Sequence, residues 1–259
     1  MGFESSPENY TVGRGQGYFN KKNNDGVYVG MRNLGNIKSL TTSVEIEKQP
    51  HYSTKAKFRT KDKEAIIEVS PKIKITLDEI NAENFAMLFL AAITEVDQTV
   101  AASAPIIVAA AKKGYVHDLG VRFIDPVGFT VTDDGATKTY VRGTDYTIDY
   151  RTGKLSVLML GSIVEGEELT VNAALLAQNY KMLNAFSENA IEGEFFYASD
   201  NAAGSNQQIT YWNVSLTPTG DTILITDGSD WSTIELEGEV LSMPEKDADF
   251  PFGRIVVID

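Results

Sequence analysis

Two long runs of alternating residues constrain the fold of this chain more than any other feature. In "SLTTSVEIEK" the positions from Leu40 to Ile46 alternate between a largely apolar face and a polar face with Thr41, Ser43, Glu45 and Glu47. In "EAIIEVSPKIKITLDEI" one face runs from Ile67 to Leu77, and the other carries Glu68, Ser70, Lys72, Lys74 and Thr76. Alternation over such lengths predicts two half-buried strands in a large hairpin with one apolar and one charged side.

The charged side of this hairpin brings opposite charges together. Glu45 and Glu47 would share a face with Lys72 and Lys74, so cross-strand ion pairs are expected. A soluble monomer can carry the same polar face, which is the plainer interpretation. Pro71 cannot donate a ladder hydrogen bond, so it predicts an edge position or a bulge at that point of the strand.

Between the two runs, "QPHYSTKAKFRTKDK" predicts a long, basic, polar connection. His51 stands there beside Tyr52 and Ser53, which raises the possibility of Ser–His–acid catalysis. The chain has no G-x-S-x-G elbow, and adjacent residues in a flexible connection seldom hold catalytic geometry. His51 is therefore expected to be a surface or interface contact.

Three alternate glycines, Gly13, Gly15 and Gly17, stand in "YTVGRGQGYFN" like a phosphate-binding loop. A dinucleotide loop must open a helix, whereas the segment after Gly17 leads into the turn residues "NND" and Gly26. Without a helix after the glycines, this segment does not fit a nucleotide-binding loop. Glycines on one strand face instead let another backbone or subunit approach closely.

One helix is predicted, in "NAENFAMLFLAAI", with Asn81 as its N-cap. Phe85, Leu88 and Phe89, with Ala92, form an apolar stripe at helical spacing, which indicates packing against a core.

The composition and the length of the predicted strands differ between the outer and the central parts of the chain. The segment 94–111 is either a linker or a weak strand, and short strands separated by turn residues then predict a compact β-meander. We expect an inserted small β domain at 98–175 and a discontinuous outer domain of 1–97 and 176–259. The segment 175–189 is expected to be polar and part-helical, and strands follow it to the end of the chain.

Charge and composition exclude several classes of function. The chain of 259 residues has no cysteine, two histidines and a net charge of −13. Thiolate metal sites and a typical zinc site are therefore disfavoured, and an acidic chain disfavours tight non-specific nucleic-acid binding. "TDDG" (Thr132 to Gly135) and "TDGSD" (Thr226 to Asp230) resemble fragments of calcium loops but lack the full ligand spacing, so turns are expected.

The balance of charge also varies along the chain. Residues 1–75 carry 13 basic and 8 acidic side chains, whereas residues 225–259 carry 2 basic and 9 acidic ones. A basic end and an acidic end suit head-to-tail self-association, although solubility is the simpler explanation.

Three segments in order resemble the tailed-bacteriophage major tail proteins, which are the subunits of the tail tube. They are "VGRGQGYFN" with the later "RNLGNIKSLTTSVEIEKQPHYSTKAKFRTKD", then "ITLDEINAENFAMLFL", and finally "IEGEFFYASDNAAGSNQQITYWNVSLTPTGDTILITDGSDWSTIELEGEVL". With the stretches between them they cover about two thirds of the chain. The resemblance implies a mainly β fold, a tail-tube-type β-sandwich or barrel with one flanking α-helix, here with the inserted β domain on the tube exterior.

The resemblance also implies an assembly and roles for particular residues. Subunits form hexameric rings that stack into a tube, and DNA passes through its channel. The long hairpin matches the strands that line an acidic lumen, which makes lumen-facing candidates of Glu45, Glu47, Glu68, Ser70, Lys72 and Lys74. The two lysines depart from an acidic lumen unless neighbouring glutamates neutralise them. The segment Pro50 to Lys63 matches a loop that reaches another ring or subunit, and the contact candidates are Arg14, His51, Tyr52, Lys55, Lys57 and Arg59.

The expected partners are further copies of the chain and other tail proteins such as the tape measure and the tail terminator. DNA would be in transit and not specifically bound, and no membrane, cofactor, metal or catalytic residue is expected. The protein would be made in the host cytoplasm and reside in the virion. Two alternatives stay open: the inner tube of a contractile injection machine, and a carbohydrate-binding β-sandwich with Tyr140, Tyr146 and Tyr150 as its aromatic platform. No catalytic constellation supports an enzyme.

Overall fold

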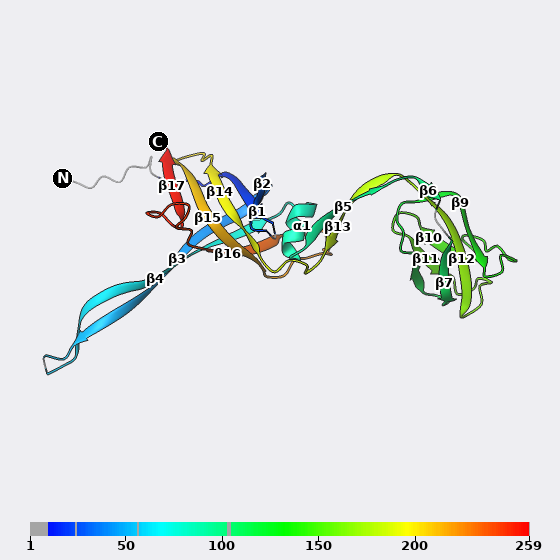
Figure 1. Cartoon of the computed structure of the whole chain (residues 1–259), viewed down its shortest axis with the longest axis horizontal. Helices are drawn as coiled ribbons and strands as arrows, with labels where there is room; N and C mark the ends of the chain where they lie inside the picture. The colour runs from blue at the N-terminus through cyan, green and yellow to red at the C-terminus, as the bar shows by residue number, and fades with distance from the viewer. Residues whose placement is uncertain (1–9, 24, 56, 103–104, 259) are drawn as a thin grey trace. The chain divides into compact units, whose positions relative to one another are not determined.

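The computed structural model describes residues 10–23, 25–55, 57–102 and 105–258, and it is mainly β with antiparallel sheets (Figure 1). The chain divides into two compact units. The first contains the chain up to Ile93 and again from Leu183, and the second is Thr94–Met182. The segment 98–175, expected from composition to be an inserted domain, lies inside the second unit.

The first unit is built on an eight-stranded sheet with the order β2-β1-β14-β15-β16-β4-β3, in which β17 also pairs with β15. Its strands are β1 (Gly15–Lys22), β2 (Tyr28–Asn33), β3 (Ile37–Ser53), β4 (Thr60–Leu77), β14 (Ile191–Ser199), β15 (Asn206–Thr219), β16 (Ile234–Val240) and β17 (Gly253–Ile258).

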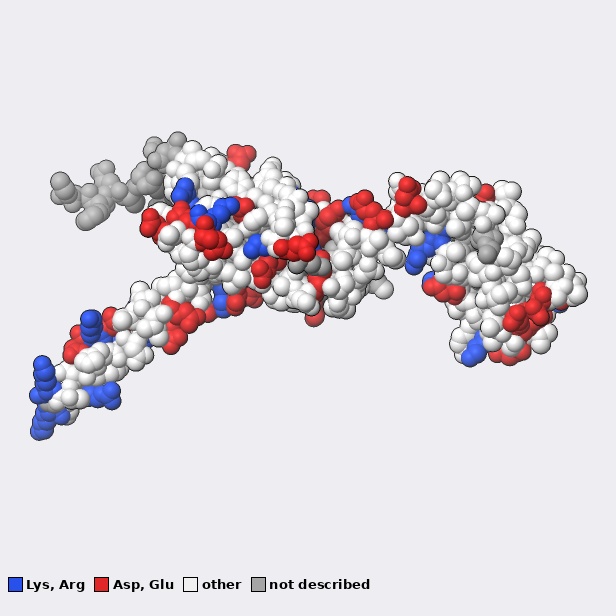
Figure 2. Space-filling model, viewed as in Figure 1, with Lys and Arg blue, Asp and Glu red and all other residues white. Residues whose placement is uncertain are grey.

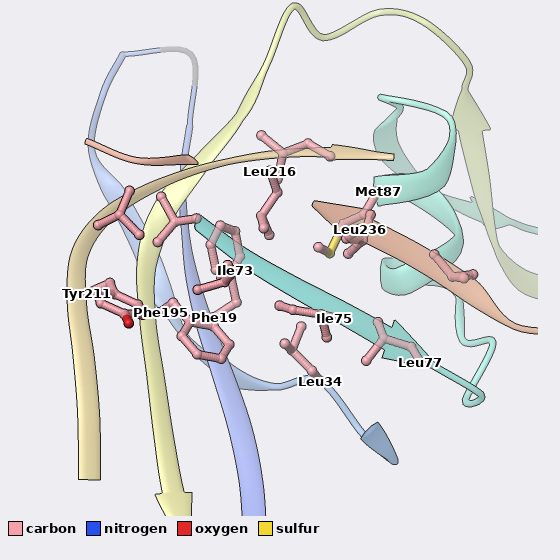
Figure 3. Close-up of a cluster of buried hydrophobic side chains, with 14 residues drawn as sticks. Phe19, Leu34, Ile73, Ile75, Leu77, Met87, Phe195, Tyr211, Leu216 and Leu236 are labelled. Carbon is pink, nitrogen blue, oxygen red and sulfur yellow. The ribbon is translucent and has the colours of Figure 1, made fainter. Parts of the chain in front are cut away.

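This sheet curves around its own core. β1 is second in the strand order and β3 is last, yet a Cβ added to Gly17 would lie 2.4 Å from Cδ1 of Ile37. Figure 3 shows the inward side chains of β1, β4, β14, β15 and β16 meeting in one cluster, among them Phe19, Phe195 and Ile75. The backbone of β14 also comes close to Gly15, where an added Cβ would lie 2.3 Å from the carbonyl oxygen of Ala198. Two of the three alternate glycines therefore admit neighbouring parts of the same chain, as expected.

The helix α1 (Ala82–Leu88) covers this core and is shorter than predicted. Asn81 caps it as expected, accepting a hydrogen bond of 2.8 Å from the backbone N–H of Asn84. The prediction that the helix continues to Ile93 is wrong. Leu90 takes a left-handed φ of 46°, and the Ala91 N–H donates to the Ala86 carbonyl, which is the hydrogen bond of a Schellman ending.

The buried face of α1 also differs from the predicted stripe. Ala86 and Met87 are buried with Asn84, whereas Phe85, Leu88 and Phe89 are only half-buried. The Asn84 side chain donates to the carbonyls of Leu34 and Glu79 and accepts from Arg32, so a polar residue anchors the helix to the sheet.

The second unit is a pair of small sheets around a separate core. Leu169 and Val131 from one sheet and Leu155 and Tyr146 from the other belong to the same buried cluster. The hairpin within residues 146–157 is as predicted. The unit as a whole is not a simple meander, because the strand 167–175 pairs with the strands 101–102, 106–111 and 124–133. The strands are β6 (Ala101–Ala102), β7 (Ile106–Ala111), β9 (Ile124–Asp133) and β12 (Glu167–Leu175) in one sheet, and β8 (Val116–Asp118), β10 (Tyr146–Asp149) and β11 (Lys154–Val157) in the other.

A further two-stranded sheet, β5 (Ala92–Gln98) with β13 (Gln178–Asn184), contains the chain connections between the units. With β6 and β7 it answers the open question about 94–111, because residues 94–98, 101–102 and 106–111 are in strands. It also corrects the part-helical prediction for 175–189, because the residues from Gln178 to Asn184 are extended.

The β3–β4 hairpin extends past the rest of the sheet (Figure 1). β16 pairs with β4 only from Leu77 to Lys72, so beyond that point β3 and β4 pair with each other alone. We call residues 44–71 the arm. Pro71 lies where the β16 pairing has ended, which confirms the edge position predicted for it. The long connection predicted from Gln49 to Lys63 is shorter than expected, because β3 continues to Ser53 and β4 begins at Thr60.

An isoleucine-to-alanine substitution on β4 should have a different effect in the core and in the arm. Ile75 is fully buried, whereas Ile66 is 59% exposed. Ile75→Ala leaves a cavity and should lower the free energy of unfolding by about 2–5 kcal/mol. Ile66→Ala should change it by less than about 0.5 kcal/mol in the monomer.

Tryptophan fluorescence during urea unfolding measures this difference, because both tryptophans, Trp212 and Trp231, lie in the first unit. Equal destabilisation by the two substitutions would contradict the division of β4 into a buried half and an exposed half.

Candidate functional site

One face of the β3–β4 ladder carries the polar residues singled out from the sequence. Glu47 pairs with Glu68 and Glu45 with Ser70 across the ladder. Lys72 and Lys74 pair with Ser43 and Thr41. Directly paired residues of an antiparallel ladder point to the same side. The shared face predicted for these six residues is therefore confirmed.

The strand β16 extends this face with three glutamates that sequence reasoning did not assign to it. Glu235, Glu237 and Glu239 pair with Thr76, Lys74 and Lys72. We call this surface the acidic face: Glu45, Glu47, Glu68, Glu235, Glu237 and Glu239, with Lys72 and Lys74 among them. The alternation in "IELEGEV" was the available signal, but which strand β16 would join was not evident from it.

Each lysine of the acidic face has a carboxylate partner. Nζ of Lys72 lies 3.0 Å from Oε1 of Glu45, as predicted, and Nζ of Lys74 lies 2.9 Å from Oε2 of Glu235 on β16, a partner that was not predicted. These hydrogen bonds raise the pKa of both lysines, and the nearby charge of Glu237 adds to the effect. The positive charges are thus neutralised locally, and the face as a whole stays acidic.

The free end of the arm is basic. Figure 2 shows Lys and Arg gathered there, with Asp and Glu further along the arm. The Arg59 guanidinium lies 4.7 Å from the centre of the Tyr52 ring, and Nδ1 of His51 lies 2.5 Å from Oδ1 of Asp62. Among the described residues, Lys55 and Lys57 have no ion-pair partner.

The arm brings five of the six predicted contact residues together, and Arg14 stands apart from them. Arg14 precedes β1, where its backbone carbonyl accepts hydrogen bonds from the Tyr197 hydroxyl and the Asp200 N–H.

The side of the arm opposite the acidic face is apolar and exposed. Val44, Ile46 and Val69 lie there by the register of the ladder, and Ile66 pairs with Lys48 on the same side. All four side chains are exposed. The expectation of half-buried strands is therefore wrong for the arm, because it has only two strands and no third element of the described residues packs on them.

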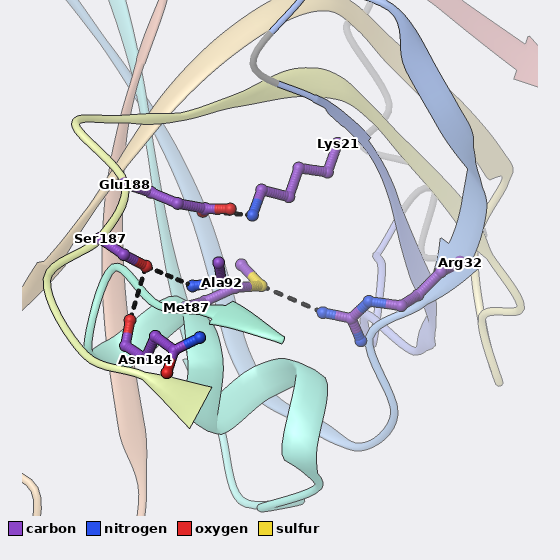
Figure 4. Close-up of polar contacts among 7 residues, drawn as sticks. All are labelled: Lys21, Arg32, Met87, Ala92, Asn184, Ser187 and Glu188. Atoms are coloured by element: carbon purple, nitrogen blue, oxygen red, sulfur yellow. Dashed lines mark hydrogen bonds and ion pairs between the residues drawn. The ribbon is translucent and has the colours of Figure 1, made fainter. Parts of the chain in front are cut away.

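A pocket of about 380 Å³ lies beside α1. Phe19, Val29 and Met87 give it an apolar lining, and Lys21 and Glu188 form an ion pair at it (Figure 4). The Arg32 guanidinium lies 3.1 Å from the Met87 sulfur, and burial lowers its pKa. Arg32 thus joins β2 to α1, and the ion pair joins β1 to the segment before β14.

The remaining predicted motifs have structural roles. Tyr140 and Tyr146 are buried in the core of the second unit and Tyr150 is half-buried, so the three do not form an exposed aromatic platform. "TDDG" forms a turn in which Asp133 accepts from Thr137 and Lys138, and "TDGSD" forms another in which Asp227 accepts from Ser229. Within the described residues, no cluster of His, Asp and Glu is arranged to hold a metal ion. No helix among them has the length and apolar character to cross a membrane.

Comparison with known proteins gives one family. The family model described as "Protein of unknown function UCP028589" matches residues 10–258. A search of curated proteins finds no match.

Because Lys72 and Lys74 have different carboxylate partners, we expect their pKa values to respond to different substitutions. Glu45→Gln should lower the pKa of Lys72 and leave that of Lys74 raised, and Glu235→Gln should do the reverse. A raised folded-state pKa means that each pair stabilises the fold below the ordinary lysine pKa and that this contribution is lost as the pH rises through the raised value. NMR titration of the lysine side-chain signals measures both groups. Identical lysine titrations in the two variants would contradict the pairing.

Proposed function

The chain belongs to the family described as protein of unknown function UCP028589, and we propose that it is a structural protein of a tailed-bacteriophage virion, the subunit of the tail tube. In this proposal the first unit has the tail-tube fold. Its copies form hexameric rings, the rings stack, and the resulting channel carries DNA to the host.

The arm is the observation that carries the proposal. A two-stranded ribbon is marginally stable by itself in water and needs a further layer on its apolar side. The arm has such a side, with Val44 and Ile46 facing outward from β3 and Ile66 and Val69 from β4. Burying one such side chain contributes about 1.5–3 kcal/mol. A second copy of the chain is the partner that a self-assembling subunit always has available.

The strand β17 supports the same proposal. Among the described strands it pairs with β15 alone, and its apolar residues are exposed although they alternate between its two faces: Ile255, Val256, Val257 and Ile258. An exposed edge strand with apolar residues on both faces is a template for pairing with another chain. Both this strand and the arm therefore favour association.

The acidic face suits a surface along which DNA slides. DNA carries a dense row of phosphate charges, so a face with six glutamates and two paired lysines repels it and offers no binding site. In the proposed tube this face lines the channel. The carbohydrate-binding alternative lacks its platform, because Tyr140 and Tyr146 are buried. The inner tube of a contractile machine would use the same assembly.

A charge on the apolar side of the arm tests the assembly. Ile46→Asp places a carboxylate where another subunit would bury an apolar side chain. It should weaken assembly at least about a hundredfold, because a loss of about 2.7 kcal/mol or more corresponds to that factor. Val127→Asp is the matched control, since Val127 is also exposed but lies in the second unit.

Sedimentation velocity and negative-stain electron microscopy measure both variants. Rings or tubes should persist with Val127→Asp and be lost with Ile46→Asp, while both chains stay folded by circular dichroism. Undiminished assembly of folded Ile46→Asp protein would argue against the arm as the subunit contact.

Charge reversal on the acidic face tests its role in DNA passage. Glu45→Lys with Glu68→Lys should leave tubes intact but slow DNA ejection from virions, because phosphates would bind the new lysines. The pair Glu45→Gln and Glu68→Gln is the control and should slow ejection less. If assembly and ejection were both unaffected by the lysines, the lumen assignment would be abandoned.

A further inference from the structure

The loop between β15 and β16 exposes apolar side chains among acidic ones. In residues 220–233, which we call the acidic loop, Ile225 is 92% exposed and Trp231 is 89% exposed, and Leu224 is exposed beside them. The loop carries Asp221, Asp227 and Asp230 and no basic residue.

Internal hydrogen bonds give the acidic loop a defined shape. The Thr226 hydroxyl donates to the Asp230 carbonyl and accepts from the Gly228 N–H. The Ser232 hydroxyl donates to the carbonyl of Ile223 at 2.6 Å, which ties the two ends of the turn together. The apolar side chains are therefore presented by an organised loop.

The free end of the arm is the chemical complement of this loop. We call Tyr52, Lys55, Lys57, Phe58 and Arg59 the basic tip. Phe58 is exposed in it between Lys57 and Arg59, and Lys55 and Lys57 lack ion-pair partners among the described residues. One surface thus offers cations around an aromatic ring, and the other offers carboxylates around an indole and two aliphatic side chains.

The two surfaces lie at opposite ends of the same strands. Leu77 at the end of β4 pairs with Ile37 and with Ile234, the residue that follows the acidic loop. At the other end Ser53 pairs with Thr60, and the basic tip joins them. β4 has 18 residues, which span about 60 Å at roughly 3.3 Å per residue. The basic tip therefore cannot reach the acidic loop of its own chain.

We propose that the basic tip of one copy docks on the acidic loop of a second copy, a contact that rests on the proposed function and names the surface that receives the arm. Phe58 packs on Leu224 and Ile225, and the face of Trp231 receives a cation of the tip. The aspartates orient the approach of Lys55 and Lys57. Exposed ion pairs contribute little energy, so the apolar contact supplies affinity and the charges supply direction.

The position of the two surfaces determines the kind of assembly. Different patches of the same chain meet in this contact, so it is heterologous and each copy both gives a tip and receives one. Because the patches lie at opposite ends of the strands, repetition propagates along the strand direction. In the tube this is the contact between successive rings, and it leaves the acidic face free along the channel.

Cysteine cross-linking tests the contact without background, because the chain contains no cysteine. The full chain would carry Lys57→Cys and Asp230→Cys together and be treated with a short bis-maleimide. Both side chains are on exposed loops, so folding should be preserved. The matched control carries Lys57→Cys with Leu160→Cys, since Leu160 is 100% exposed in the second unit.

The Lys57→Cys/Asp230→Cys chain should give a ladder of dimers, trimers and longer products on a denaturing gel, with a yield about tenfold or more above the control pair. The ladder should fade at 1 M salt, where the Debye length falls to about 3 Å. Electron microscopy of the same samples separates the two proposals. Tubes without the ladder would overturn the docking contact and leave the proposed function standing. A ladder without tubes would support the contact and count against the tail-tube function, and neither product would overturn both.

Discussion

The β3–β4 ladder runs from the core of the first unit into the exposed arm, and the positions of the acidic face and of the apolar side of the arm depend on its register. Ile73, Ile75 and Leu77 are held in the core of the first unit. A slip of one residue would turn each of them outward, so the core determines the register strongly. The same register continues to the Glu47–Glu68 pair and determines which side chains of that part of the arm point to each side; irregularities in the pairing follow it at Lys48 and Tyr52. The glutamates of the acidic face and the apolar side of the arm are therefore positioned by packing that takes place elsewhere in the strand.

This dependence explains how well the hairpin could be predicted from the sequence. Alternation assigned Glu45, Glu68 and Lys72 to a common face, and the ladder places them there. Alternation says which residues share a side, but it does not say whether another layer covers that side. Ile46 was therefore expected to be half-buried, although it is exposed in the single chain. The distinction depends on where β16 ends, which is a long-range property.

The other discrepancies also come from long-range contacts. Lys74 finds Glu235 because β16 enters the sheet next to β4, although the two strands are far apart in the sequence. The helix stops at Leu88 because Leu90 adopts a left-handed conformation and the chain turns into β5, despite an apolar run that favours a longer helix. The segment from Gln178 to Asn184 is a strand because β5 provides its partner. In the helix and in the strand, pairing or packing overrode local propensity, and for Lys74 pairing supplied a partner that lies far away in the sequence.

The proposed function gives these features one purpose. In this proposal the apolar side of the arm and the basic tip join copies of the chain, and the acidic face keeps phosphates from binding. Cryo-electron microscopy of the assembled wild-type protein tests this account most directly. The account predicts a hollow tube with Glu237 and Glu239 facing the channel and each arm buried against a neighbouring subunit. A solid fibre, or a tube with these glutamates on its outer surface, would contradict it.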